Sequence, residues 1–212
     1  GYVMIKGTIS VRAVWQPVKR LYIAVKIGRV DLVKTLLLRS DIDVNEAQKN
    51  GLTALHIAAA KGYADVVRAL INADGIDINR AYKNAMNTTP LYLAALNGRA
   101  DVVRILIKAS GIDVNKASTD GETPLHAAAG RGHANVVRIL INVEGIDVNK
   151  AENRNGSTPF DIAVYFGHAD VVRELINLRG IDVNKTEKNG KTLLWTAAYK
   201  GYADVVRELI KA

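Results

Sequence analysis

The sequence predicts an all-α solenoid of about six stacked helix-turn-helix repeats with short projecting turn fingers. This prediction depends on three short phrases that recur along the chain. A phrase similar to Thr-Pro-Leu-His recurs in steps of 36, 34, 35 and 34 residues, beginning at Thr53, Thr89, Thr123, Thr158 and Thr192. Phrases of the form Asp-Val-Val-Arg and Ile-Asp-Val-Asn keep the same step. Periods of this length are typical of arrays in which neighbouring repeats bury a shared core.

Each phrase predicts one local structure, in the same order in every repeat. Threonine followed by proline, as at Pro124, opens a first helix, because threonine caps free N–H groups and proline fits the first helical position. A later glycine, such as Gly132, allows the positive φ that ends this helix. A second helix follows, and in repeat two Val66, Val67 and Leu70 belong to its apolar face. The polar stretch after Asp-Val-Asn predicts an extended turn, which we call the finger.

The pattern resembles the ankyrin repeat, whose signature T-P-L-H-x-A is matched in full by the segment that begins at Thr123. The resemblance implies a curved stack in which fingers project from one edge and the first helices line a concave surface. We divide the chain into a non-repeat N-terminal segment, residues 1–16, and an ankyrin-repeat domain, residues 17–212. The expected repeats lie near residues 17–50, 51–86, 87–120, 121–155, 156–189 and 190–212.

The two ends depart from the interior pattern. Residues 2–15 alternate apolar with other side chains, which predicts a strand-like segment that covers the open face of repeat one. The alternative is a functional basic arm, since the first 20 residues contain four basic residues and no acid. The last helix keeps the interior apolar face, where a terminal cap would be more polar. We therefore expect that the chain was cut from a longer array or that a partner covers this face.

Composition excludes several classes of protein. The chain has no cysteine, which excludes disulfides, thiolate catalysis and cysteine-ligated zinc and favours a reducing, cytoplasmic compartment. Removal of a native leader would leave the compartment unknown. No apolar run is long enough to cross a bilayer, so membrane insertion is not expected. The net charge of +8 invites a nucleic-acid interpretation, but half of it comes from the first 20 residues.

The histidines and carboxylates predict structural roles. His56 and His126 occupy the histidine position of the signature, and the resemblance implies hydrogen bonds within and between repeats. His133 and His168 follow a helix-ending glycine where tyrosine stands in other repeats, which is not expected of a metal ligand. The recurring aspartates predict caps and turns, because paired catalytic acids need unlike environments. We predict no enzymatic activity, no metal site and no cofactor.

Positions that differ between repeats predict the binding surface, because framework positions recur and functional positions vary. They lie in the fingers and at the ends of the first helices, which the resemblance places along the concave groove. The candidate partner-binding residues are Lys49, Asn50, Leu52, Lys61, Lys83, Met86, Leu96, Asn97, Asp120, Glu122, Arg131, Arg154, Asn155, Tyr165, Phe166, Lys188, Lys191, Tyr199 and Lys200. Tyr165 and Phe166 place an aromatic pair there, and the basic residues predict a protein partner of acidic character.

Two sets of framework positions carry further expectations. Tyr92 and Trp195 replace the signature histidine, and we expect both to be largely buried. The asparagines of Ile-Asp-Val-Asn resemble those that are hydroxylated in some family members. Their direct role is expected to be hydrogen bonding to backbone groups of the turn. One basic residue per second helix forms an arginine ladder that either binds phosphates or, as we favour, is a solvated face: Arg68, Arg104, Arg138, Arg173 and Arg207.

The leading interpretation is a non-catalytic protein–protein interaction scaffold that binds its partner through the concave face and the turn fingers. One alternative is binding of nucleic acid or an anionic surface through the basic arm and the arginine ladder. Another is an engineered or consensus-like scaffold with no natural partner, because the copies are close to one another. A monomer is expected, with end-to-end association as the alternative.

Overall fold

Twelve α-helices, arranged as six pairs, make up the described part of the repeats. The computed structural model describes residues 4–5, 8–9, 17–82, 86–186 and 190–212. The helices are α1 Pro17–Lys26, α2 Val30–Leu37, α3 Ala54–Lys61, α4 Ala64–Ile71, α5 Pro90–Leu96, α6 Ala100–Leu106, α7 Pro124–Gly130, α8 Ala134–Leu140, α9 Pro159–Phe166, α10 Ala169–Leu175, α11 Leu193–Tyr199 and α12 Ala203–Lys211.

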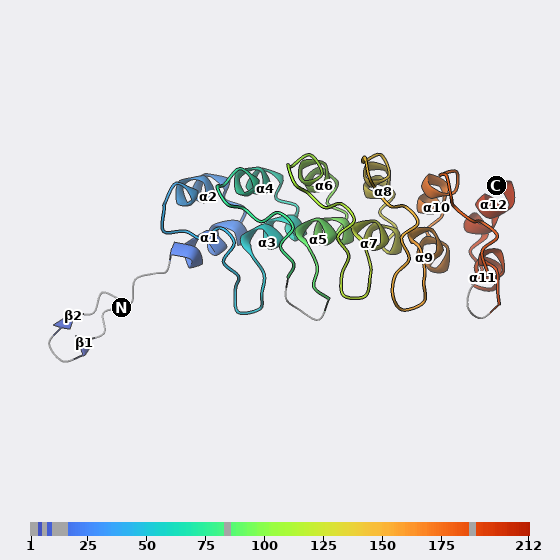
Figure 1. Cartoon of the computed structure of the whole chain (residues 1–212), viewed down its shortest axis with the longest axis horizontal. Coiled ribbons are helices and arrows are strands. Elements are labelled where there is room, and N and C mark those ends of the chain that lie inside the picture. The colour runs from blue at the N-terminus through green and yellow to red at the C-terminus, as the bar shows by residue number, and fades with distance from the viewer. Residues whose placement is uncertain (1–3, 6–7, 10–16, 83–85, 187–189) are drawn as a thin grey trace.

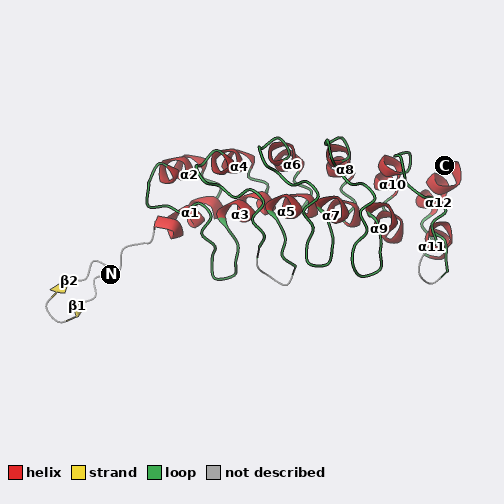
Figure 2. Cartoon of the chain, viewed as in Figure 1, coloured by secondary structure: helices red, strands yellow, loops and turns green. Residues whose placement is uncertain are grey.

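The helix pairs stack along one axis. The first helices of the pairs, α1 to α11 in odd numbers, form one row, and the second helices form a second row above it (Figure 1). Each helix packs on its partner in the pair and on the corresponding helix of the adjoining pair. The fingers are green loops that project from the first-helix row in Figure 2. This arrangement confirms the predicted helical solenoid.

The predicted helix signals operate as local hydrogen bonds. Before α7, the Thr123 side chain accepts a hydrogen bond from the His126 backbone, and the Thr123 backbone N–H donates to the His126 imidazole at 3.1 Å. This reciprocal capping box satisfies two N–H groups that a helix start leaves open. Two residues after α7, Gly132 has a φ of +72°, which a residue with a side chain rarely adopts.

The core lies between the two helix rows and continues through the stack. Alanines on the first helices, such as Ala58, Ala94 and Ala128, are 0% exposed and let adjoining helices approach closely. Leucine and valine from the second helices fill the space between the rows, and Leu70 and Leu140 are also 0% exposed. Burial of each such leucine contributes about 2 kcal/mol, so the stack is held together mainly by apolar contact between repeats.

The asparagine of Ile-Asp-Val-Asn links one repeat to the next. Asn115 donates from Nδ2 to the Gly145 carbonyl at 2.7 Å and accepts from the Asp147 N–H at 2.9 Å. Asn45 and Asn79 make the same pair of bonds with their following repeats. These three residues form a ladder along the stack. Within the described chain, the side chain of Asn149 makes neither bond, although it has the same sequence context.

The segment before α1 contains two short strands. β1 Met4–Ile5 pairs antiparallel with β2 Thr8–Ile9, with Met4 opposite Ile9. Strand character in the N-terminal segment is therefore confirmed for these four residues. The prediction that residues 2–15 cover the open face of repeat one falls mainly on residues outside the described ranges, as does much of the basic arm.

Candidate interaction surface

The signature histidines are structural. The His56 ring is 0% exposed and lies 2.7 Å from the Thr53 hydroxyl and 3.2 Å from the Thr88 carbonyl of the next finger. His126 makes the matching contact with the Ser157 carbonyl at 3.2 Å. Burial lowers the pKa of His56 to about 4, so its imidazole is neutral at pH 7. The predicted hydrogen bonds within and between repeats are confirmed.

The residue after the helix-ending glycine joins adjoining first helices, a role that sequence reasoning missed. Nε2 of His133 lies 3.1 Å from the Leu96 carbonyl, and Nε2 of His168 lies 3.1 Å from the Gly130 carbonyl. In repeat three, Arg99 occupies this position and donates to the carbonyl of Ala60 at 3.1 Å. The alternation of histidine with arginine was the available signal, because both residues donate hydrogen bonds. Among the described residues, no three metal-binding side chains form a group.

The arginine ladder is neutralised by neighbouring acids. Arg104 pairs with Asp101 at 2.8 Å on its own helix. Repeat four lacks that aspartate, and its Arg138 pairs with Glu174 of the next repeat. Arg173 contacts an acid of its own helix and Glu208 of the next repeat, the latter at 2.9 Å. The ladder is exposed but balanced, which favours a solvated face over a phosphate-binding stripe.

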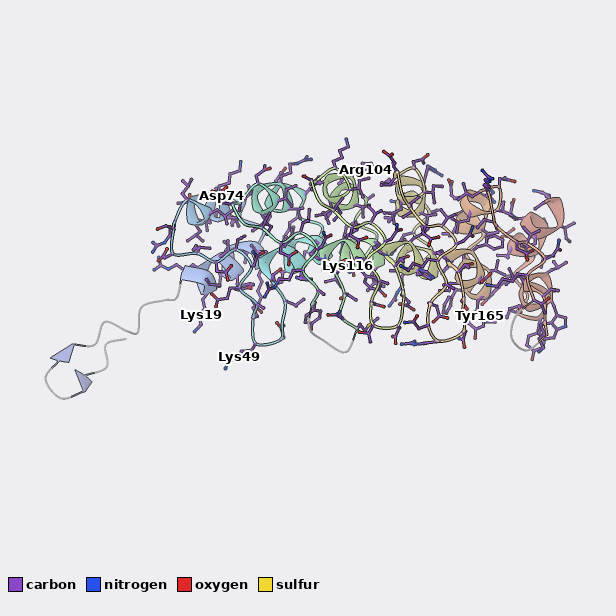
Figure 3. The ribbon with its side chains drawn as sticks, viewed as in Figure 1. Lys19, Lys49, Asp74, Arg104, Lys116 and Tyr165 are labelled. Atoms are coloured by element: carbon purple, nitrogen blue, oxygen red, sulfur yellow. The ribbon has the colours of Figure 1, made fainter. Side chains whose placement is uncertain are left out.

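We call the fingers and the C-terminal ends of the first helices the finger surface. Lys49 and Tyr165 lie on it, whereas Arg104 and Asp74 lie on the opposite, second-helix side of the stack (Figure 3). Eleven candidate residues are exposed: Lys49, Asn50, Lys61, Asn97, Arg131, Arg154, Asn155, Tyr165, Phe166, Lys191 and Tyr199. Six are partly buried: Leu52, Met86, Leu96, Asp120, Glu122 and Lys200. Lys83 and Lys188 lie outside the described residues.

The acids of the finger surface are occupied within the fold. Asp120 forms an ion pair with Arg154 of the next finger. Glu122 accepts a hydrogen bond from the Tyr92 hydroxyl at 2.7 Å, which links repeat three to the finger of repeat four. Asp120 therefore offsets Arg154, which is itself one of the basic candidates, and the remaining described bases keep an excess of positive charge on the finger surface.

Glu152 fixes the finger that precedes α9, and its role was missed because it falls on no recurring phrase. Its carboxylate accepts backbone N–H bonds from Arg154, Asn155 and Ser157 at 2.5, 2.7 and 3.2 Å. Burial acts to raise the pKa of Glu152, but these N–H donors outweigh burial and lower it. Arg154 and Asn155 are thus held in place before any partner arrives.

Aromatic side chains gather at the C-terminal part of the finger surface. Tyr165 and Phe166 are 48% and 54% exposed, and their rings pack edge to face with centroids 5.2 Å apart. The ammonium group of Lys200 lies 3.3 Å from the centre of the Tyr165 ring and donates to the Tyr165 carbonyl at 3.0 Å. This contact orders the lysine beside the aromatic pair, and both aromatic side chains remain about half exposed.

The expectation for Trp195 is wrong, whereas that for Tyr92 is confirmed. Tyr92 is 2% exposed because the next finger covers it. Trp195 occupies the same position in the last described pair, which no further finger covers within the described stack, and is 41% exposed. Its ring stacks on Tyr199, 77% exposed, at 4.9 Å and an interplanar angle of 10°. Lys191 places its ammonium group 3.6 Å from the Trp195 ring.

The described helices include none whose length and apolar character would let it cross a membrane.

Family models of the ankyrin repeat match nearly the whole of the repeated region. The model described as Ankyrin repeats (3 copies) matches residues 21–118 and 110–187, and the model described as Ankyrin repeat matches residues 189–212. No curated protein sequence matches the chain. Among solved structures, the ankyrin repeat protein EF0377 is 28% identical with a TM-score of 0.80, over 92% of this chain and 98% of that one. Ankyrin repeats are generally protein–protein interaction modules and are typically not enzymes. The chain belongs to the ankyrin repeat family.

Proposed function

We propose that this protein is a non-catalytic binding module that takes an acidic protein partner on its finger surface, the expected concave side of the stack. The observation that carries the proposal is the exposed pair Tyr165 and Phe166 at a first-helix end where the four preceding repeats have small, aliphatic, basic or polar residues and the last repeat has a single aromatic residue, Tyr199. Aromatic rings supply large contact areas at little conformational cost, which is why they dominate binding hot spots.

The charges of the finger surface support an acidic partner. The candidate residues described there include six bases, Lys49, Lys61, Arg131, Arg154, Lys191 and Lys200, and two acids, Asp120 and Glu122. Asp120 pairs with Arg154, one of these six bases, and Glu122 is bound by Tyr92, so the two acids offset the six bases only in part. Such a field speeds the approach of an acidic partner and repels a basic one.

The nucleic-acid alternative receives less support from the structure. The arginine ladder lies on the second-helix side, and its members pair with carboxylates of the same or the next repeat. A phosphate would have to compete with those carboxylates for each guanidinium group. The finger surface combines bases with exposed aromatic rings in one region and therefore remains the preferred site.

The test is capture of partners from a cell lysate by immobilised protein, with mass spectrometry as the readout. The double variant Tyr165→Ala/Phe166→Ala should lose the partner that the unchanged protein retains, with the same circular dichroism melt. Leu38→Ala is the matched control, because Leu38 is a large apolar residue, 88% exposed, on a second-helix end. The retained partner should elute as salt rises. Equal capture by the double variant and the control would refute this site.

A further inference from the structure

One position on the finger surface recurs at the C-terminal end of every first helix and varies in charge from repeat to repeat. It is the residue before the helix-ending glycine, and we call the residues at this position the rim row: Ile27, Lys61, Asn97, Arg131, Phe166 and Lys200. The first five are exposed although a further repeat follows each of them, so the stack leaves this position open in its interior. The last three alternate as base, aromatic ring and base.

The two bases on either side of Phe166 are available to a carboxylate of a partner. Arg131 is exposed and, unlike Arg154, forms no ion pair with an acid among the described residues. The Lys200 ammonium group lies 3.3 Å from the Tyr165 ring centre and donates to the Tyr165 carbonyl at 3.0 Å. One of its three N–H groups is used there, which fixes the position of the charge and leaves two donors for a carboxylate.

The spacing of the rim row follows from how closely the first helices pack. Packed helices lie about 8–10 Å apart. Ala94 and Ala128 on the first helices are 0% exposed, and a methyl carbon added at Gly130 would lie 3.1 Å from the Ile162 side chain of α9. Such close contact excludes a wider separation, so successive rim-row residues lie about 9 Å apart.

Among regular conformations of a partner segment, polyproline II matches this spacing. It repeats every three residues with a rise of about 3.1 Å, so side chains three residues apart share one face and lie about 9 Å apart. In a β-strand, residues on one face lie about 7 or 13 Å apart. The nearest match on an α-helix is seven residues, about 10.5 Å, which would be out of step by about 3 Å over two repeats.

We propose that the partner segment on the rim row is an acidic polyproline II segment with one carboxylate three residues before, and another three residues after, a large apolar side chain. The apolar side chain packs on Phe166, and the carboxylates pair with Arg131 and Lys200. Such a segment is extended before it binds, which lowers the conformational cost of binding. The inference rests on the proposed function and adds the conformation of the partner and the spacing of its charges.

The test compares two synthetic peptides of the same composition by fluorescence anisotropy. Both carry a fluorophore and have neutral, blocked ends. The in-register peptide is Asp-Pro-Pro-Leu-Pro-Pro-Asp, and the shifted peptide, Pro-Asp-Pro-Leu-Pro-Asp-Pro, moves each carboxylate one position inward. The in-register peptide should bind about 10-fold more tightly, because only its carboxylates reach both bases and each exposed ion pair contributes little.

Charge-removing variants test which residues read the spacing. Arg131→Gln and Lys200→Gln should each reduce the preference for the in-register peptide to about 3-fold, and the double variant should abolish it. Lys108→Gln is the matched control, because it removes one exposed positive charge just after α6, a second helix. The preference is the quantity compared, because a loss of order around Lys200 would weaken the binding of both peptides equally.

Three results would overturn the proposal: equal binding of the two peptides, no binding of the in-register peptide up to about 1 mM, or tighter binding of a helical peptide with acids seven residues on either side of leucine. The variant Tyr165→Ala/Phe166→Ala separates this failure from failure of the proposed function. If the peptides bind the unchanged protein equally and neither binds the variant, the finger surface stands and only the spacing is refuted. If both bind the variant as tightly as the unchanged protein, the spacing and the site are both refuted.

Discussion

The asparagine ladder allows the fold to be tested with two substitutions in identical sequence phrases. Asn115→Ala removes two hydrogen bonds to the next repeat, at 2.7 and 2.9 Å, whereas Asn149→Ala removes no side-chain bond that the structure shows. A net hydrogen bond contributes roughly 0.5–1.5 kcal/mol, and these bonds are partly exposed, which places each near the lower half of that range. We therefore expect Asn115→Ala to lower the free energy of unfolding by about 1–2 kcal/mol and Asn149→Ala by less than about 0.5 kcal/mol.

Urea unfolding followed by circular dichroism measures both values, and the slope of the transition shows whether cooperativity is kept. Asn79→Ala serves as a second positive case, because Asn79 makes the same two bonds at 2.6 and 2.9 Å. Equal losses for Asn115→Ala and Asn149→Ala would refute the reasoning. They would mean that the phrase contributes through its own turn and not through the junction.

Three other predictions test burial, close approach and a buried charge. The pKa of His56 is about 4 in the folded protein, below the usual 6.5. The stability that the neutral ring contributes is therefore complete above about pH 6.5 and is lost as the pH falls toward 4, by up to about 3 kcal/mol. In His56→Gln, the melting temperature should depend less on pH over this range. Gly132→Ala should cost about 1 kcal/mol more than Gly145→Ala in urea unfolding, since both have positive φ but only at Gly132 would the new methyl carbon lie 2.7 Å from an imidazole nitrogen of the next repeat. Lys185→Met should lower stability by about 2 kcal/mol, because Asp161, 8% exposed, loses its ion-pair partner, and adding Asp161→Asn should restore part of that loss.

Much of the fold follows from the sequence because its causes are local. A threonine cap, a first-turn proline and a helix-ending glycine act within one or two turns, so five copies of the phrase predict the structured part of each repeat. The helices that begin at Pro90, Pro124 and Pro159 start where these signals place them. The buried state of Tyr92 also follows, because an interior repeat has a neighbour on both sides.

The features that sequence reasoning missed depend on contacts between repeats. The exposure of Trp195 is set by the absence of a following finger from the described stack, which its own repeat does not encode. The lack of the two ladder bonds at Asn149 is likewise not encoded in its own phrase, since that phrase matches those of its bonded counterparts. The candidate binding surface could be proposed from the positions that differ between repeats. The ion pair between Asp120 and Arg154 could not be predicted in the same way, because it depends on how adjoining fingers lie in space.

The signature-histidine position shows how one structural requirement is met by different residues. The side chain at this position must contact the following finger. Its hydrogen-bond or ion-pair partner there differs according to whether the side chain is histidine, tyrosine or aspartate. His126 contacts a backbone carbonyl, Tyr92 donates to Glu122, and the ammonium group of Lys185 pairs with Asp161.

Each polar solution is therefore a pair that joins a first helix to the finger that follows it. A carboxylate at this position is stable in the interior only when that finger brings a cation to it. It follows that a first helix of this chain cannot be exchanged without the finger that follows it. Moving α9 without Lys185 would bury Asp161 without a counterion, whereas a first helix with histidine needs only a carbonyl from the next finger.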